Sequence, residues 1–174
     1  MQLHVLQSIS LAGNAAVPND DRAGNTARLA WVIDGATDLG APGLVGSQGG
    51  AAWLASEAQA AFAAASDAPI EALCRTVADR LAGAYAVART REPEGRWELP
   101  IASFLAIRLD ADGLEIGWLG DCAALLVRGD AIVRLGPVRE VRDAETALAE
   151  SLAHHVLGAQ KKSAPIVETL RARA

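Results

Sequence analysis

The alternation of apolar and polar positions predicts strands in the first part of the chain, over about residues 2–10 and 26–33. The second of these strands is expected to bury a face made of three large residues: Leu29, Trp31 and Ile33. Between the two strands, residues 13–24 are rich in Asn, Asp and Gly, which is typical of a loop. Residues 35–50 carry many glycines and a proline, so they are predicted to form a second loop.

The middle of the chain has the 3.6-residue period of two amphipathic helices. One helix is expected to begin near Gln48, and the other after the start signal Ser66-Asp67-Ala68-Pro69. The apolar positions that share a face of the first helix are Leu54, Ala58, Ala61, Phe62 and Ala65. Those of the second are Ile70, Leu73, Cys74, Val77, Leu81, Ala84, Tyr85 and Ala88. The two helices are therefore predicted to pair through one shared apolar face.

From Pro100 onwards the pattern returns to strands and turns. Strands are predicted over residues 101–109, 114–119, 122–127 and 131–135. Further helices are expected over residues 143–157 and from Ser163 onwards. This order of elements is not the strict alternation of a doubly wound fold, so it predicts an α+β class with antiparallel sheets covered by helices. Because no strand follows the last helix, we expect the sequence to be part of a longer domain.

Length and composition indicate one folded domain over residues 1–174. Half of the residues are apolar (51%) and 21% are charged, which is ordinary for a globular protein. A net charge of −5 without a run of lysine or arginine disfavours binding to nucleic acid. No apolar run approaches the ~20 residues that a membrane-spanning helix needs. Trp31, Trp53 and Trp118 lie in apolar runs and are predicted core residues.

The N-terminus and the cysteines predict a cytoplasmic protein. Met1-Gln2-Leu3-His4-Val5 lacks the basic and then apolar character of a signal peptide. Cys74 and Cys122 do not form a CxxC pair and lie in apolar runs, so they are predicted to be buried free thiols in a reducing compartment.

Carboxylates at the ends of strands carry the candidate chemistry. Asp34-Gly35 directly follows an intensely apolar strand, Asp20-Asp21 precedes that strand, and Gly120-Asp121 lies between two later apolar runs. A lone Asp-Gly is more often a local turn. Three acidic strand ends without a cluster of histidine or cysteine, however, favour a hard divalent cation held by oxygen ligands.

These motifs, in this order, resemble the metal-dependent protein phosphatase family (PPM, type 2C). The resemblance runs over roughly residues 8–135. It rests on Asn19-Asp20-Asp21-Arg22, on the strand Trp31-Val32-Ile33-Asp34-Gly35, on the helix pair, on Pro100-Ile101-Ala102-Ser103-Phe104 and on Trp118-Leu119-Gly120-Asp121-Cys122-Ala123. It implies an antiparallel β-sandwich between helix layers (αββα), incomplete at the C-terminus, with a two-metal Mg²⁺ or Mn²⁺ centre at one end.

The resemblance also implies a role for each acidic residue. Asp34 corresponds to the carboxylate that bridges the two metals, and the carbonyl of Gly35 to a further ligand. Asp20 and Asp21 correspond to the acidic pair on one metal, and Asp121 to the aspartate that helps hold an additional, weaker metal. The implied chemistry is attack on a phosphate ester by a metal-bridging water, whose pKa the cations lower.

The chain departs from the family pattern at three places. The two late carboxylates of the family's site have no counterpart after residue 143, Ala12–Pro18 contains no phosphate-binding arginine, and Ala36 stands where a histidine often follows Asp-Gly. Arg22 could contact phosphate, although a solvated arginine is the commoner case.

Three functions are weighed on this pattern. The first is a serine/threonine phosphatase for a phosphorylated protein or a small phosphoester. The alternative is a non-catalytic, regulatory PPM-like domain that binds such a ligand. The third, an N-terminal-nucleophile hydrolase, requires a nucleophile that Met1-Gln2 does not supply.

Overall fold

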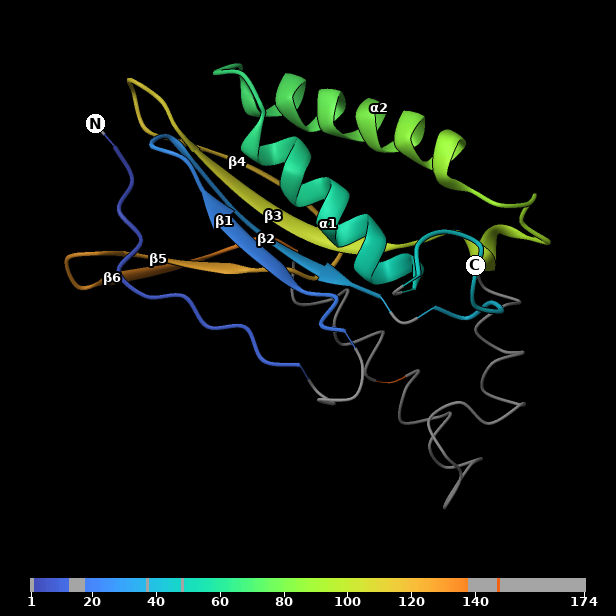
Figure 1. Cartoon of the computed structure of the whole chain (residues 1–174). Helices are drawn as coiled ribbons and strands as arrows, with labels where there is room; N and C mark the ends of the chain where they lie inside the picture. The colour runs from blue at the N-terminus through green and yellow to red at the C-terminus, as the bar shows by residue number, and fades with distance from the viewer. Residues whose placement is uncertain (1, 13–17, 37, 48, 138–146, 148–174) are drawn as a thin grey trace.

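The computed structural model describes residues 2–12, 18–36, 38–47, 49–137 and 147, and within them it is a mixed α+β fold (Figure 1). The elements in chain order are β1 (Arg22–Asn25), β2 (Leu29–Gly35), α1 (Gly50–Ala63), α2 (Ile70–Ala88), the 3-10 turn η1 (Arg96–Glu98), β3 (Ala102–Leu109), β4 (Leu114–Leu119), β5 (Ala124–Arg128) and β6 (Ala131–Leu135).

The strands form two antiparallel sheets. One has the order β1-β2-β3-β4, and the other is the hairpin of β5 and β6. Figure 1 shows α1 and α2 side by side over one face of the four-stranded sheet, with the β5–β6 hairpin on its other side. On that second side Leu105 of β3 is only 3% exposed, and a side chain added at Gly136, just after β6, would touch it.

Aromatic residues hold the helices to the sheet. Leu29, Trp31 and Ile33 of β2 are buried, as their spacing predicts. Phe62 of α1 is 1% exposed; its ring stacks on that of Trp31 with centroids 5.7 Å apart and is tilted against that of Phe104, also at 5.7 Å. The helices α1 and α2 confirm the predicted helix pair, and β3 to β6 confirm the strands predicted from residue 101 to residue 135.

The structure corrects the prediction for the first two strands. Residues 2–10 do not form a strand; one backbone bond, from the Leu3 N–H to the Ala27 carbonyl, attaches them to the β1–β2 turn. Their alternating pattern lacks a strand to pair with, and a strand is defined by its ladder. The first strand is instead β1, which begins inside the loop predicted over residues 13–24 and ends one residue after it. Its small and polar residues form an edge that periodicity does not reveal.

Other predictions on burial are partly wrong. Trp118 is 48% exposed and is not a core residue. Both cysteines are free, as expected, but they are half-buried. The helices predicted over residues 143–157 and from Ser163 lie outside the described residues. Over the part of the chain that is described, no helix is long and apolar enough to cross a membrane.

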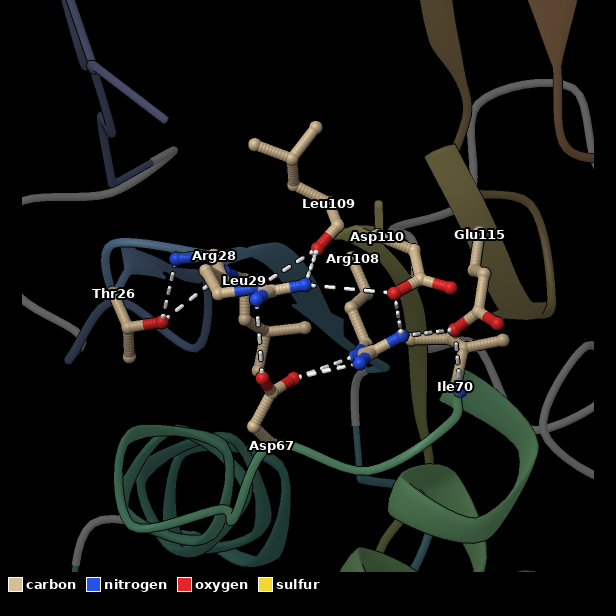
Figure 2. Close-up of polar contacts among 9 residues, drawn as sticks. All are labelled: Thr26, Arg28, Leu29, Asp67, Ile70, Arg108, Leu109, Asp110 and Glu115. Atoms are coloured by element: carbon tan, nitrogen blue, oxygen red, sulfur yellow. Dashed lines mark hydrogen bonds and ion pairs between the residues drawn. The ribbon is translucent and has the colours of Figure 1, made fainter. Parts of the chain in front are cut away.

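An ion network fastens one end of the four-stranded sheet to the helix pair (Figure 2). The Arg108 side chain is 9% exposed; it donates to Asp67 at 2.7 and 2.9 Å and to Glu115 at 2.9 Å. Glu115 also accepts the first N–H of α2, from Ile70, at 3.0 Å. Arg28 adds an ion pair to Asp67 at 3.4 Å. The network therefore joins β3, β4, the α1–α2 loop and the first residue of α2.

A second ion pair closes the connection between α2 and β3. The Glu98 side chain is 2% exposed and accepts hydrogen bonds of 2.7 Å from both terminal nitrogens of Arg91 and from the Glu94 N–H. The Arg91 side chain, followed by the Glu94 N–H, lowers the pKa of Glu98 from 4.5 to about 2. The folded state therefore favours the charged form of Glu98 more strongly than the unfolded state does.

The depressed pKa of Glu98 predicts a specific acid sensitivity. Its contribution to stability is complete above pH 4.5 and is lost as the pH falls from there to about 2. We expect the melting temperature to fall over that interval, and Glu98→Gln to reduce both the neutral-pH stability and the steepness of the fall. Circular dichroism melts at several pH values measure this. Glu71→Gln removes an exposed pair with Arg75 and should leave the profile unchanged; equal profiles for both variants would contradict the prediction.

Candidate metal centre

Asp34 and Asp121 meet at the end of the sheet opposite the ion network. Asp34 occupies an exposed position near the end of β2 and is the cross-strand partner of Ser103 on β3. The Ser103 hydroxyl donates to Asp121 Oδ1 at 2.8 Å. Gly120 makes this approach possible, because its φ is +80° and a Cβ there would lie 2.2 Å from Ser103 Oγ. Ser103 therefore links the position of Asp34 to the turn after β4.

The acidic pair is held beside Gly35 by local hydrogen bonds. The Asn19 side-chain oxygen accepts the Asp21 N–H at 2.9 Å. Arg22 donates to the carbonyls of Asn19 and Asp21 and, at 3.0 Å, to the hydroxyl of a serine on α1. A Cβ added at Gly35 would lie 2.8 Å from both the Cβ and the carbonyl oxygen of Asp20. Glycine at this position thus lets the acidic turn pack directly against the end of β2.

These carboxylates interact electrostatically with one another. Burial raises the pKa of Asp34, and the negative charges of Asp21, Asp121 and Asp20 raise it further. The Asp21 side chain also lies close enough to hydrogen-bond the neutral form of Asp34. Among the described residues, no lysine or arginine forms an ion pair with any of the four. The structure thus gathers acidic groups from three separate segments without a neutralising side chain.

A thiol lies at the edge of this cluster. Cys122 follows Asp121, and its pKa is raised to about 11, first by burial and then by the charges of Asp34 and Asp121. The Asp34 backbone N–H opposes part of this shift by hydrogen-bonding the thiolate. The thiol is therefore protonated at neutral pH.

The carboxylates are close together but do not form a closed coordination shell. Within the described part of the chain, no group of three or more His, Cys, Asp or Glu side chains is arranged to hold a metal ion. Carboxylate oxygens from separate segments therefore share one end of the sheet without converging on a common point. Carboxylates of this kind suit Mg²⁺ or Mn²⁺, which keep several water ligands in protein sites.

Sequence reasoning missed the residues that position the acids. The Arg22 side chain is half-buried and donates to the backbone of the acidic turn and to α1. Asp38 caps α1 by accepting the N–H groups of Gly50 and Ala51 at 2.7 and 3.1 Å. This contact spans twelve residues, so the sequence around the helix start gave no local signal for it. The contact of Ser103 with Asp121 is long-range and left no local signal.

Comparison with protein-family models, with curated proteins and with solved structures finds no match to this chain. The resemblance to the PPM family therefore rests on the order of motifs in the sequence.

Proposed function

We propose that this chain is a PPM-like domain that binds Mg²⁺ or Mn²⁺ at the acidic end of its four-stranded sheet and receives a phosphate ester there. The metal ligands in this proposal are Asp20, Asp21, Asp34, the carbonyl of Gly35 and Asp121. The ester belongs to a phosphorylated protein or a small phosphoester in the cytoplasm.

The observation that carries the proposal is the contrast between the two ends of the sheet. At one end, Asp67, Asp110 and Glu115 form ion pairs with Arg28 and Arg108. At the other end, the charges of Asp21, Asp121 and Asp20 act on Asp34, and none of the four has an ion-pair partner among the described residues. Uncompensated acids cost stability, and sites that bear such a cost are often functional.

Each residue of the acidic cluster has its own role in this proposal. Asp34 interacts with the other three carboxylates, and Ser103 holds the carboxylate of Asp121 by a hydrogen bond. Arg22 holds the turn that presents Asp20 and Asp21. A bound divalent cation would supply Lewis-acid activation of a water and of a phosphoryl oxygen.

The alternative is a domain that binds a phosphorylated ligand without hydrolysing it. The position of Arg22 favours this alternative, because the arginine is committed to the acidic turn and to α1. The carboxylates that complete the family's two-metal centre also have no counterpart in this sequence. We therefore expect weak cation binding and turnover of an aryl phosphate near the background rate.

Thermal melts with and without cation test the metal site. With a millimolar dissociation constant, 10 mM Mn²⁺ is expected to raise the melting temperature by about 3 °C. Asp34→Asn should abolish this rise. It should also raise the melting temperature without cation at pH 7, because a carboxylate whose pKa is raised in the folded state destabilises the fold once the pH exceeds that pKa.

The matched control is Asp112→Asn, which changes an exposed aspartate in the β3–β4 turn. It should keep the Mn²⁺ response of the unmodified chain. An Mn²⁺ response that survives Asp34→Asn would refute the site. Hydrolysis of p-nitrophenyl phosphate with Mn²⁺ separates the two functions: robust turnover that Asp34→Asn abolishes would establish the enzyme and refute the binding-only alternative.

A further inference from the structure

The N-terminal segment, residues 2–10, is attached at both of its ends to the residues that flank β1. At one end, the Leu3 N–H donates to the Ala27 carbonyl at 2.7 Å, just after β1. At the other end, the Asn19 side chain donates to the Ser10 hydroxyl at 2.7 Å, just before β1. Between these two contacts, no backbone bond of the described residues joins the segment to β1.

The course of the segment is that of an antiparallel neighbour of β1. Its first residues meet the end of β1 and its last residues meet the beginning, so the two stretches run in opposite directions. Their lengths also match: extended chains span roughly 23 Å from Leu3 to Ser10 and roughly 26 Å from Asn19 to Ala27. Figure 1 shows the segment as an extended trace that belongs to neither sheet.

The free edge of β1 presents backbone groups to such a neighbour. Thr26 donates to the Leu29 carbonyl, and the groups that face one neighbour alternate with those that face the other along an antiparallel strand. The N–H and C=O groups of Ala23 and Asn25 therefore point away from β2. The bond that attaches the segment is accepted by Ala27, which continues this outward series.

The register that starts from the existing bond is compatible with a ladder. Counting along both stretches from that bond places Val5 opposite Asn25 and Gln7 opposite Ala23. These are the two positions of β1 whose backbone groups face outward. The attachment at the far end, through Asn19, keeps the two stretches close to the same register.

The same register gives an exposed leucine a place to pack. Leu6 is 97% exposed, and the register places it opposite Gly24. A Cβ at Gly24 would lie 2.5 Å from the ring of Trp31, so Leu6 would come to lie beside that ring. Removing this side chain from water favours the paired arrangement.

We propose that residues 2–10 form a strap that closes on β1 as an additional antiparallel strand, with Val5 opposite Asn25 and Gln7 opposite Ala23. In the open form the strap is held at its two ends, as the structure shows. Closing adds the backbone bonds of a ladder and covers an edge that is otherwise free for pairing with another chain.

Asn19 connects the strap to the acidic turn. Its side-chain nitrogen donates to Ser10, while its side-chain oxygen accepts the Asp21 N–H at 2.9 Å. A closed strap therefore restrains the turn that carries Asp20 and Asp21, and closing and cation binding at this turn favour each other. This coupling rests on the proposed cation site, whereas the closing of the strap does not.

Amide hydrogen exchange of the whole chain, followed by NMR without added cation, tests the closing. A closed strap protects the N–H groups of Ala23 and Asn25, which face outward from β1. We expect both groups to exchange at least about tenfold more slowly than in an unfolded peptide. The rates should not depend on protein concentration, because the strap and β1 belong to the same chain.

Two adjacent proline substitutions test the register. In the closed strap the Gln7 N–H points at the Ala23 carbonyl, so Gln7→Pro removes a ladder bond and should abolish the protection. The Ser8 N–H points away from β1, so Ser8→Pro is the matched control and should keep the protection. Both substitutions replace an exposed polar residue of the strap.

The coupling is tested by repeating the exchange with about 10 mM Mg²⁺. The cation should slow the exchange of the Ala23 and Asn25 amides about fivefold further. Asp34→Asn should cancel this additional slowing and keep the protection seen without cation. Gln7→Pro should weaken Mg²⁺ binding about fivefold relative to Ser8→Pro, since the coupling is reciprocal.

Each contrary outcome overturns a definite part of the proposal. Unprotected amides at Ala23 and Asn25, or equal rates in Gln7→Pro and Ser8→Pro, overturn the strap. Protection that grows with protein concentration assigns the edge to a second copy of the chain and overturns it as well. A cation that raises the melting temperature but leaves the exchange rates unchanged overturns the coupling. A cation that changes neither refutes the cation site, and the contrast between the proline variants still decides the strap.

Discussion

Phe62→Ala is expected to lower the free energy of unfolding by about 3–5 kcal/mol, the range for a fully buried aromatic side chain. Phe62 is 1% exposed and contacts the rings of Trp31 and Phe104. It therefore joins α1 to the two central strands of the four-stranded sheet. Its removal leaves a cavity at the point where helix and sheet meet, and aromatic contacts are lost in addition to buried area. Urea titration followed by circular dichroism measures the change.

Two controls distinguish core packing from a general effect of truncation. Phe62→Leu keeps much of the volume and should cost about 1 kcal/mol. Val87→Ala on α2 removes an apolar side chain that is 88% exposed and should change the stability by less than about 0.5 kcal/mol. A Phe62→Ala variant no less stable than Val87→Ala would contradict the placement of Phe62 in the core.

Local patterns predicted most of the fold because burial repeats regularly within each element. Leu29, Trp31 and Ile33 lie on one face of β2 because side chains alternate along a strand. β1 was missed because an edge strand of small and polar residues has no buried face to produce such a pattern. Residues 2–10 were overpredicted for the opposite reason: their alternation is regular, but pairing depends on a distant partner.

The sequence predicted which acidic residues belong to the candidate site, because their type and their positions at strand ends are visible in it. The sequence placed Asp34, the Asp20-Asp21 pair and Asp121 near element ends, and the structure brings them to one end of the sheet. The contacts that position these residues depend on the register of the sheet. Ser103 lies opposite Asp34 because of the register in which β2 and β3 pair. Such support becomes visible only when the register is known.

Arg108→Met is expected to lower the melting temperature by roughly 5–10 °C. Methionine keeps most of the apolar stem but cannot donate hydrogen bonds. Asp67 and Glu115 would then lose the guanidinium that both of them bind, and Arg28 alone would face the acids at this end of the sheet (Figure 2). The loss should be largest at low salt, since the remaining carboxylates repel one another. Differential scanning calorimetry at two salt concentrations measures it.

The surface pair of Arg75 with Glu71 provides the control for this experiment. Both of these side chains are mostly exposed, at 71% and 83%, so Arg75→Met should change the melting temperature by less than about 2 °C. If the loss in Arg108→Met arises from uncompensated acids, adding Asp67→Asn should recover part of it, because the double variant removes one of the repelling charges. A loss no larger than that of Arg75→Met, or a double variant less stable than Arg108→Met, would show that the network does not fasten the helix pair to the sheet.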